Sequence, residues 1–232
     1  MPFSQQTIDF LIENRLRDSR AWFAENHERY QRFVIEPLRE LVVRLTPCMR
    51  TIDAEVVTEP RVDKTICRIW RDTRYSHDKL LYRDTLWIIF KRGRMHSTEA
   101  PGLYFEIGPD GFNYGTGFYA PSSSYMQTLR AMVLAGAPSF QAAQRAYAAQ
   151  DVFRMEGECF KRARYPDQPE ALRAWLERRS IGFYAESADF DLLFSDGLAD
   201  RLSDDFARIA PVYRFLMDAA LEEKKRAIAR PY

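Results

Sequence analysis

The sequence predicts an α+β fold in a single domain over residues 1–232, with an antiparallel sheet packed with N-terminal and C-terminal helices. Three observations carry this prediction. Apolar residues recur at helical spacing before residue 47, short runs of β-forming residues follow up to residue 118, and helical patterns return after residue 122. Helices grouped on either side of a block of strands are typical of α+β proteins. We find no linker or repeat that would divide the chain.

Three helices are expected in the N-terminal part. Ser4 is a suitable N-cap for the first, which we expect to end in a turn through Asn14–Asp18. Ser19 can cap the second, whose aromatic residues recur at helical spacing. Pro37 suits the first turn of the third helix, and Pro47 is expected to end it, because proline cannot donate a helical hydrogen bond.

The middle of the chain predicts strands. Glu55–Thr58 and Thr65–Arg71 are short and rich in β-forming residues. Thr85–Lys91 is nearly all apolar, which predicts a central strand buried on both faces. Leu103–Ile107 and Phe112–Phe118 flank the sequence Gly-Pro-Asp-Gly, whose residues favour a tight turn. These last two segments therefore predict a β-hairpin.

Helices and strands are mixed in the remainder of the chain. Helices are expected to open at Ser122 or Ser123, at Ser139 and at Pro169, with strands over Val152–Met155 and Ile181–Ala185. Ser195 or Asp196 can cap a further helix, and Pro211 is expected to start a separate last helix.

The composition indicates a globular protein, with 46% hydrophobic and 29% charged residues. No segment approaches the roughly 20 apolar residues of a membrane span, and the N-terminus has no signal-peptide pattern. The three cysteines, Cys48, Cys67 and Cys159, are far apart, which favours a reducing compartment. We therefore expect a cytoplasmic protein without membrane association. Because only three histidines are present and none shows ligand spacing, we expect no metal and no cofactor.

Charge is concentrated in one part of the chain. Residues 61–94 hold ten Lys or Arg against four Asp, a balance of +6, whereas the whole chain carries +1. Residues 186–205 hold seven acids and one Arg, a balance of −6. One interpretation is a basic site for an anion. The alternative is that the two stretches neutralise each other through internal ion pairs.

The core of the basic stretch, residues 68–84, reads Arg-Ile-Trp-Arg-Asp-Thr-Arg-Tyr-Ser-His-Asp-Lys-Leu-Leu-Tyr-Arg-Asp. It resembles the Arg-Asp-Thr-Arg-Phe-Ser-Lys-Asp-Lys hallmark of a bacterial and fungal family known only as a conserved domain of unknown function. Four further segments also resemble the pattern of this family, at residues 20–23, 102–105, 115–121 and 161–169, so the resemblance covers nearly the whole chain. The resemblance implies a single domain and brings no reaction, cofactor or partner with it.

Three residues depart from that family's pattern. His77 stands where lysine is usual, Leu81 where proline is usual, and Gln168 where histidine is usual. The last departure argues against a required histidine at that position.

The residue types of the charged segment favour the binding of an anion in a polar cleft at the edge of the sheet. The planar guanidinium of arginine matches the oxygens of a carboxylate or phosphate. The candidate ligand-binding residues are Arg68, Arg71, Arg74, Lys79, Tyr82, Arg83 and Tyr104. Asp72 and Asp78 are expected to hold the cations in position, and Arg71 is expected at a strand end. A purely structural network of Arg and Asp remains the alternative, because buried charges need partners whatever their purpose.

Three carboxylates are candidates for catalysis: Asp72, Asp78 and Glu106. Glu106 shares a strand face with Tyr104, and aromatic surroundings can raise the pKa of a carboxyl group and suit it to acid–base chemistry. The run Ser76-His77-Asp78-Lys79 is not expected to form a triad, because adjacent side chains in an extended segment diverge.

Several functions stay open at this stage. We favour a small phosphate- or carboxylate-bearing ligand over nucleic acid, because the whole chain is nearly neutral. A hydrolytic or phosphoryl-transfer enzyme acting on such a ligand, a nucleic-acid binder and a structural interaction module are the alternatives. The sequence specifies neither a reaction nor an oligomeric state.

Overall fold

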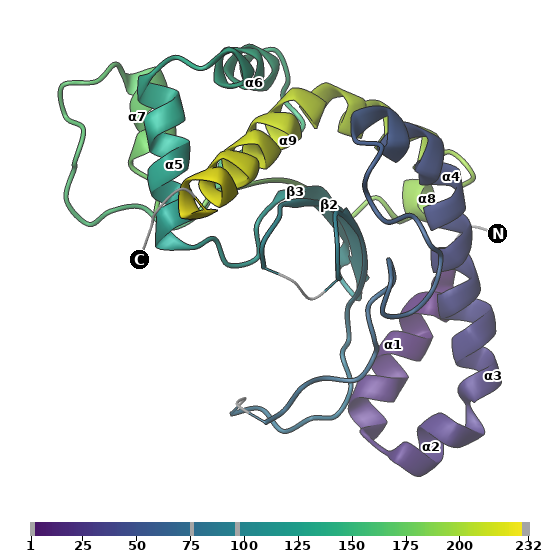
Figure 1. The fold of residues 1–232 in the computed structure, drawn as a ribbon. Helices are drawn as coiled ribbons and strands as arrows, with labels where there is room; N and C mark the ends of the chain where they lie inside the picture. The colour runs from purple at the N-terminus through teal and green to yellow at the C-terminus, as the bar shows by residue number, and fades with distance from the viewer. Residues whose placement is uncertain (1–2, 75–76, 96–97, 229–232) are drawn as a thin grey trace. The chain divides into compact units, whose positions relative to one another are not determined.

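The computed structural model describes residues 3–74, 77–95 and 98–228, and it confirms the α+β fold (Figure 1). The N-terminal helices are α1 (Gln5–Arg17), α2 (Arg20–Glu25), α3 (His27–Tyr30), the π-helical turn η1 (Gln31–Ile35) and α4 (Glu36–Ile52). The later helices are α5 (Ser123–Leu134), α6 (Pro138–Ala148), α7 (Glu170–Leu176), α8 (Phe190–Leu193) and α9 (Leu198–Ile228). None of these described helices is both long and apolar enough to cross a membrane.

The strands form one antiparallel sheet in the order β1-β2-β3-β5-β4. They are β1 (Leu86–Lys91), β2 (Gly102–Gly108), β3 (Gly111–Gly117), β4 (Arg154–Glu156) and β5 (Gly182–Ser187). Strands β2 and β3 form the predicted hairpin around Pro109 and Asp110. Strand β5 lies beside β3 and pairs with β4, where Met155 stands opposite Phe183.

Strand β1 is the first strand of the sheet and not its centre, which corrects the expectation from its apolar sequence. Its side chains alternate between buried and half-buried positions over Leu86–Ile89, as in a strand with one covered face. The two segments predicted as strands before it, Glu55–Thr58 and Thr65–Arg71, form no regular strand. The second of them contributes only isolated bridges, Ile66 to Ile88 and Trp70 to Tyr82.

Two prolines lie inside helices that they were expected to delimit. Helix α4 continues through Pro47 to Ile52, and α9 continues through Pro211 instead of beginning there. In each case the residue four positions earlier, Val43 or Ala207, is exposed. The carbonyl group that loses its helical partner can therefore be hydrated, which lowers the cost of an interior proline.

The predicted helix caps are confirmed at two serines. The Ser19 hydroxyl accepts a hydrogen bond from the Trp22 amide (3.3 Å), and the Ser122 hydroxyl accepts one from the Tyr125 amide (2.9 Å). Helix α1 runs to Arg17, past the turn expected from Asn14, and ends where Asp18 adopts a left-handed conformation with φ of 43°. That conformation places Asp18 at the helix end, where its side chain receives a hydrogen bond described below.

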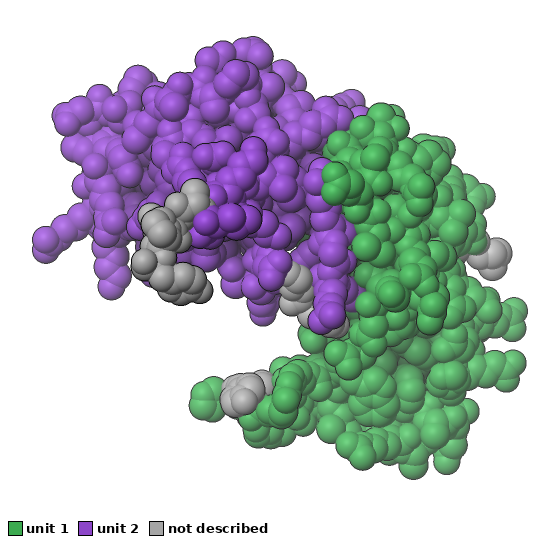
Figure 2. All heavy atoms as spheres, viewed as in Figure 1, with its two compact units in different colours: residues 1–90, 104–114, 186–204 green, residues 91–103, 115–185, 205–232 purple. Residues whose placement is uncertain are grey.

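The chain divides into two compact units, coloured in Figure 2. Unit 1 comprises residues 1–90, 104–114 and 186–204, and unit 2 comprises residues 91–103, 115–185 and 205–232. The expectation of a single domain over residues 1–232 stays a prediction. The charged segment and all of the candidate residues belong to unit 1.

Each unit has its own buried apolar core. In unit 1, α1 and α4 bury side chains such as Leu11 and Leu38, and Phe3 stacks on Phe105 of β2 at 5.8 Å between ring centroids. In unit 2, Trp175 of α7 is buried against Phe140 and Phe183, with 5.3 Å between its ring centroid and that of each phenylalanine. Close packing of large aromatic rings is a major source of stability in such cores.

A glycine in β3 tests the pairing of β3 with β5. A Cβ at Gly115 would overlap the Phe183 carbonyl oxygen of the neighbouring strand, whereas a Cβ at Gly182 would meet its nearest atom at 3.9 Å. We expect Gly115→Ala to lower the free energy of unfolding by about 1–3 kcal/mol, the usual cost of overpacking. Gly182→Ala is the matched control and should change it by less than about 0.5 kcal/mol. Urea unfolding measures both, and equal stability of the two variants would contradict this geometry.

Candidate functional site

The charged segment forms an irregular two-stranded ribbon in which residues 65–71 pair with residues 81–89, and the described residues of its tip are 72–74 and 77–80 (Figure 1). The Arg71 amide donates to the Leu81 carbonyl (2.8 Å), and the Arg83 amide donates to the Ile69 carbonyl (2.9 Å). Closer to β1, the Cys67 amide donates to the Trp87 carbonyl (2.9 Å). The ribbon therefore extends β1 outward, and Arg71 lies at the end of its paired part, where the sequence predicted the end of a regular strand.

Aromatic packing fixes one face of the ribbon to the N-terminal helices. Tyr82 is fully buried, with its ring centroid 4.3 Å from that of Trp70 and 5.1 Å from that of Phe23 in α2. Trp70 is 39% exposed and covers the outer side of this stack. Tyr82 was predicted as a ligand-binding residue, but the structure places its side chain in the core of unit 1.

Asp78 joins the ribbon to helix α1. Its carboxylate accepts hydrogen bonds from the Leu80 amide (2.9 Å), from Arg15 Nη2 (2.7 Å) and from Arg71 Nη1 (2.5 Å). Arg15 Nη1 also donates to the Tyr82 carbonyl (2.6 Å). The Leu80 amide, followed by the Arg15 guanidinium, holds the pKa of Asp78 at about 2. Arg71 is thus paired with one of the carboxylates predicted for it.

A second junction with α1 lies beside this network. The Leu81 amide donates to Asp18 Oδ1 at 2.6 Å. Asp18 is the residue that ends α1 in a left-handed conformation. Because the two junctions hold neighbouring residues of the same ribbon strand, they fix the strand that leads to Arg83.

Three further cations of the charged segment also have partners. Arg74 donates to Asp72 through Nε (2.9 Å) and Nη2 (2.7 Å), and this pair lowers the pKa of Asp72 to about 2. Lys79 Nζ donates to the Thr73 carbonyl (3.0 Å), and Arg68 Nε lies 2.9 Å from Asp63. Arg74 is 76% exposed in its side chain, so the pair with Asp72 is a solvated one of little energetic weight.

A different set of polar residues lies on one face of the sheet, and we call it the sheet-face cluster: Arg83, Thr85, Trp87 and Glu106. A Cβ at Gly108 would lie 2.8 Å from Thr85 Cγ2, so Thr85 faces Gly108 across the β1–β2 pairing. In an antiparallel pair this register places Trp87 opposite Glu106, with both side chains on the same face. Tyr104, two residues before Glu106 in β2, shares that face.

Arg83 is the cation of the sheet-face cluster, and its guanidinium carbon lies 4.6 Å from the centre of the Trp87 ring. Its Nε is buried and has no hydrogen-bond partner among the residues that the structure describes. Within the same part of the chain, Arg83 forms no ion pair. Contact with an indole ring orients a guanidinium but leaves its planar hydrogen-bonding edge unused.

Glu106 is the carboxyl group of the sheet-face cluster. Burial raises its pKa, and a hydrogen bond from Thr85 and the positive charge of Arg83 lower it in part. No ion pair of Glu106 is found in residues 3–74, 77–95 and 98–228. Burial also raises the pKa of the neighbouring Cys67 thiol to about 12, so this cysteine is protonated and unreactive at neutral pH.

The structure therefore separates residues that the sequence analysis assigned to one cleft. Asp72, Arg74 and Lys79 lie on the tip, Arg68 lies in the paired part of the ribbon, Arg71 and Asp78 join the ribbon to α1, and Arg83 and Glu106 lie on the sheet face. No group of three potential metal ligands occurs in the described part of the chain. Ser76 lies outside the described residues, and His77 is exposed.

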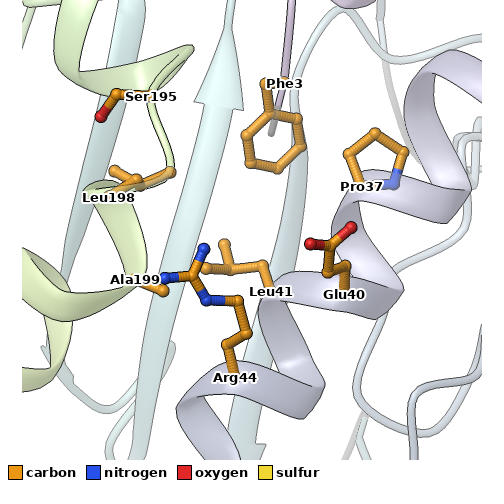
Figure 3. Close-up of a pocket in the computed structure, with 8 residues that line it drawn as sticks. All are labelled: Phe3, Pro37, Glu40, Leu41, Arg44, Ser195, Leu198 and Ala199. Carbon is orange, nitrogen blue, oxygen red and sulfur yellow. The ribbon is translucent and has the colours of Figure 1, made fainter. Parts of the chain in front are cut away.

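A small cavity in unit 1 lies away from the charged segment. It is lined by Phe3, Pro37, Glu40, Leu41, Arg44, Ser195, Leu198 and Ala199 (Figure 3). Its volume of about 20 Å³ is enough for a single water molecule. Arg44 bridges this region by donating to the Asp196 carbonyl (2.7 Å). The cavity is too small for a substrate, and we assign it a packing role.

Two residues of the site region were missed by the sequence analysis. Arg15 is a solvent-side position of an amphipathic helix, and nothing in the local sequence distinguishes it from Arg17. Trp87 belongs to an apolar run that was interpreted as a strand buried on both faces. If that run had been interpreted as a strand with one covered face, Trp87 would have been predicted on the open face and would have been a candidate site residue.

The Asp78 junction predicts a specific acid sensitivity. Because the pKa of Asp78 is depressed to about 2 in the folded state, its contribution to stability is present above its ordinary pKa near 3.8 and is lost as the pH falls towards 2. We expect Asp78→Asn to be less stable than wild type at pH 6 and to lose less stability between pH 4 and 2. Urea unfolding at several pH values measures this. Asp110→Asn, in the exposed hairpin turn, is the control, and parallel pH profiles for wild type and Asp78→Asn would refute the assignment.

Comparison with known proteins gives a family match and nothing further. No curated protein and no solved structure matches the chain. The model of a family described as "Conserved hypothetical protein (DUF2461)" matches residues 6–215, which include all of α1 except Gln5, the ribbon and the whole sheet. Because this match covers most of the chain, the protein belongs to the DUF2461 family of conserved hypothetical proteins.

Proposed function

We propose that this protein binds a small anionic ligand, bearing a carboxylate or a phosphate, at the sheet-face cluster, and that Arg83 is its main contact. The observation that supports the proposal is that the Arg83 side chain is partly buried and has a hydrogen-bond donor that no described residue satisfies. Its guanidinium is held against Trp87 with a buried Nε that has no partner in the described part of the chain. Arg15, Arg71 and Arg74, by contrast, all donate to carboxylates of the protein.

The energetics support a ligand for Arg83. A buried donor without an acceptor costs about 1–3 kcal/mol, and natural structures rarely retain that cost without a reason. A carboxylate or phosphate accepts two parallel hydrogen bonds from a guanidinium, and such charge-assisted bonds are roughly twice as strong as neutral ones. The anion would therefore satisfy the group that the fold leaves unsatisfied.

The tip has a supporting role in this proposal. Arg68, Arg74 and Lys79 are exposed, and although each has a partner, they surround the ribbon with positive charge. A local excess of positive charge raises the concentration of anions near a surface and their rate of association. We favour a small anion over nucleic acid because the chain carries a net charge of only +1.

A catalytic role is the second candidate, and Glu106 is the residue that favours it. Burial raises its pKa above the ordinary value of a carboxyl group, which is the direction that acid–base chemistry requires. Asp72 and Asp78 do not suit this role, because the Arg74 guanidinium holds the pKa of Asp72 at about 2, and the Leu80 amide with the Arg15 guanidinium holds that of Asp78 at about 2. An enzyme of this kind would use Glu106 as its acid or base, acting on the ligand that Arg83 binds. We also propose a cytoplasmic location, which the three free cysteines support.

Substitution of Arg83 tests the proposal. We expect Arg83→Gln to weaken the binding of inorganic phosphate and of acetate by about 10- to 100-fold, the loss that one or two charge-assisted hydrogen bonds would cause. Arg74→Gln, which removes a more exposed cation of the same ribbon, should change the dissociation constants by less than about twofold. NMR titration of the backbone amides measures both. Equal binding by wild type and Arg83→Gln would refute the role of Arg83.

A further inference from the structure

We infer that the ligand carries a hydrogen-bond donor, an ammonium or a hydroxyl group, close to its anionic group, and that Glu106 accepts this donor while Arg83 binds the anion. The ligand class is therefore an amino acid or a hydroxy acid, or a larger molecule that presents the same pair of groups. This inference rests on the proposed anion site and adds the second half of its recognition.

The first support is the placement of the two groups on one face of the sheet. The approach of Thr85 to Gly108 sets the register that puts Trp87 opposite Glu106. Side chains of such a cross-strand pair have Cβ atoms about 4.5–5.5 Å apart. Arg83 lies over the Trp87 ring at 4.6 Å. One small molecule resting beside the Trp87 ring can therefore reach both charged groups.

The second support is that the two groups do not satisfy each other. Glu106 feels the positive charge of Arg83, yet in the described part of the chain the two side chains form no ion pair. A cation and a carboxylate on the same half-buried surface would normally pair directly. Here the guanidinium lies over the indole ring, so its hydrogen-bonding edge is not used by Glu106.

The third support is chemical complementarity. An ionised carboxylate can only accept hydrogen bonds, so a ligand that offered an anion alone would place like charges side by side. A hydrogen-bond donor on the ligand offsets that repulsion, and an ammonium group also neutralises the negative charge of the partly buried Glu106 carboxylate. Within the described part of the chain, the Glu106 carboxylate receives a hydrogen bond from Thr85 and lies near the positive charge of Arg83, but it forms no ion pair, so it can still accept a hydrogen bond from a charged donor on a ligand.

A series of three-carbon acids tests the inference directly. Propionate, L-lactate and L-alanine share a carboxylate and differ at one carbon, which carries hydrogen, a hydroxyl or an ammonium group. For the wild-type protein at pH 7.5, we expect L-alanine and L-lactate to bind at least fivefold more tightly than propionate, as measured by NMR titration. Inorganic phosphate serves as the reference anion without a carbon-bound donor.

Two variants of Glu106 separate charge from hydrogen bonding. Glu106→Gln keeps an acceptor oxygen but removes the charge, so it should lose the preference for L-alanine and keep much of that for L-lactate. Glu106→Leu removes the acceptor, so it should lose both preferences and bind propionate at least as well as wild type does. Retention of wild-type preferences in both variants would overturn the inference.

The remaining outcomes distinguish this inference from the proposed function. If wild type binds all three acids equally and Arg83→Gln loses them all, the anion site stands and the donor inference fails. Binding of inorganic phosphate without any binding of L-alanine or L-lactate also overturns the inference. If none of the four probes binds to the wild-type protein, both the inference and the anion site of the proposed function are rejected.

Discussion

The carboxylate of Asp78 is the junction on which the geometry of the charged segment depends. It receives Arg15 from α1, Arg71 from one side of the ribbon and the Leu80 amide from the other. The segment has few other means of holding its shape, because its pairing consists of isolated bridges and not of a continuous ladder. A ribbon of this kind is only marginally stable by itself. Its attachment to a helix of unit 1 therefore determines where Arg83 lies.

The same attachment explains why so many charges occur in so short a segment. The aromatic stack of Trp70, Tyr82 and Phe23 fixes one face of the ribbon, and the hydrogen bonds of Arg15 and Asp18 fix its backbone from α1. With both restraints in place, the direction of Arg83 is set by its backbone bond to Ile69. Arg71 and Asp78 thus hold the ribbon that carries Arg83, whereas Arg68, Arg74 and Lys79 have separate partners.

The parts of the fold that could be predicted are those encoded by neighbouring residues. The β2–β3 hairpin follows from a Gly-Pro-Asp-Gly turn, and the helix starts at Ser19 and Ser122 follow from side chains that cap their own helices. The errors arose where tertiary surroundings decide. Pro47 and Pro211 remain within helices because the affected carbonyl groups belong to exposed residues, and β1 is apolar although only one of its faces is fully covered. Neither condition can be read from the local sequence.

For the candidate site, the sequence identified several of the residues but did not predict which of them lie together in space. Arg83, Tyr104 and Glu106 were selected separately, on residue type and strand periodicity, and the structure places Arg83 and Glu106 around Trp87 because Thr85 meets Gly108. The register of β1 and β2 is a long-range property, since ten residues separate the two strands and no turn signature fixes their alignment. The partner of Asp78 in α1 was unpredictable for the same reason. Charge density along the sequence therefore located the segment, but only pairing in space distinguishes a cation that the protein pairs with its own carboxylate, such as Arg71, from one without an ion pair among the described residues, such as Arg83.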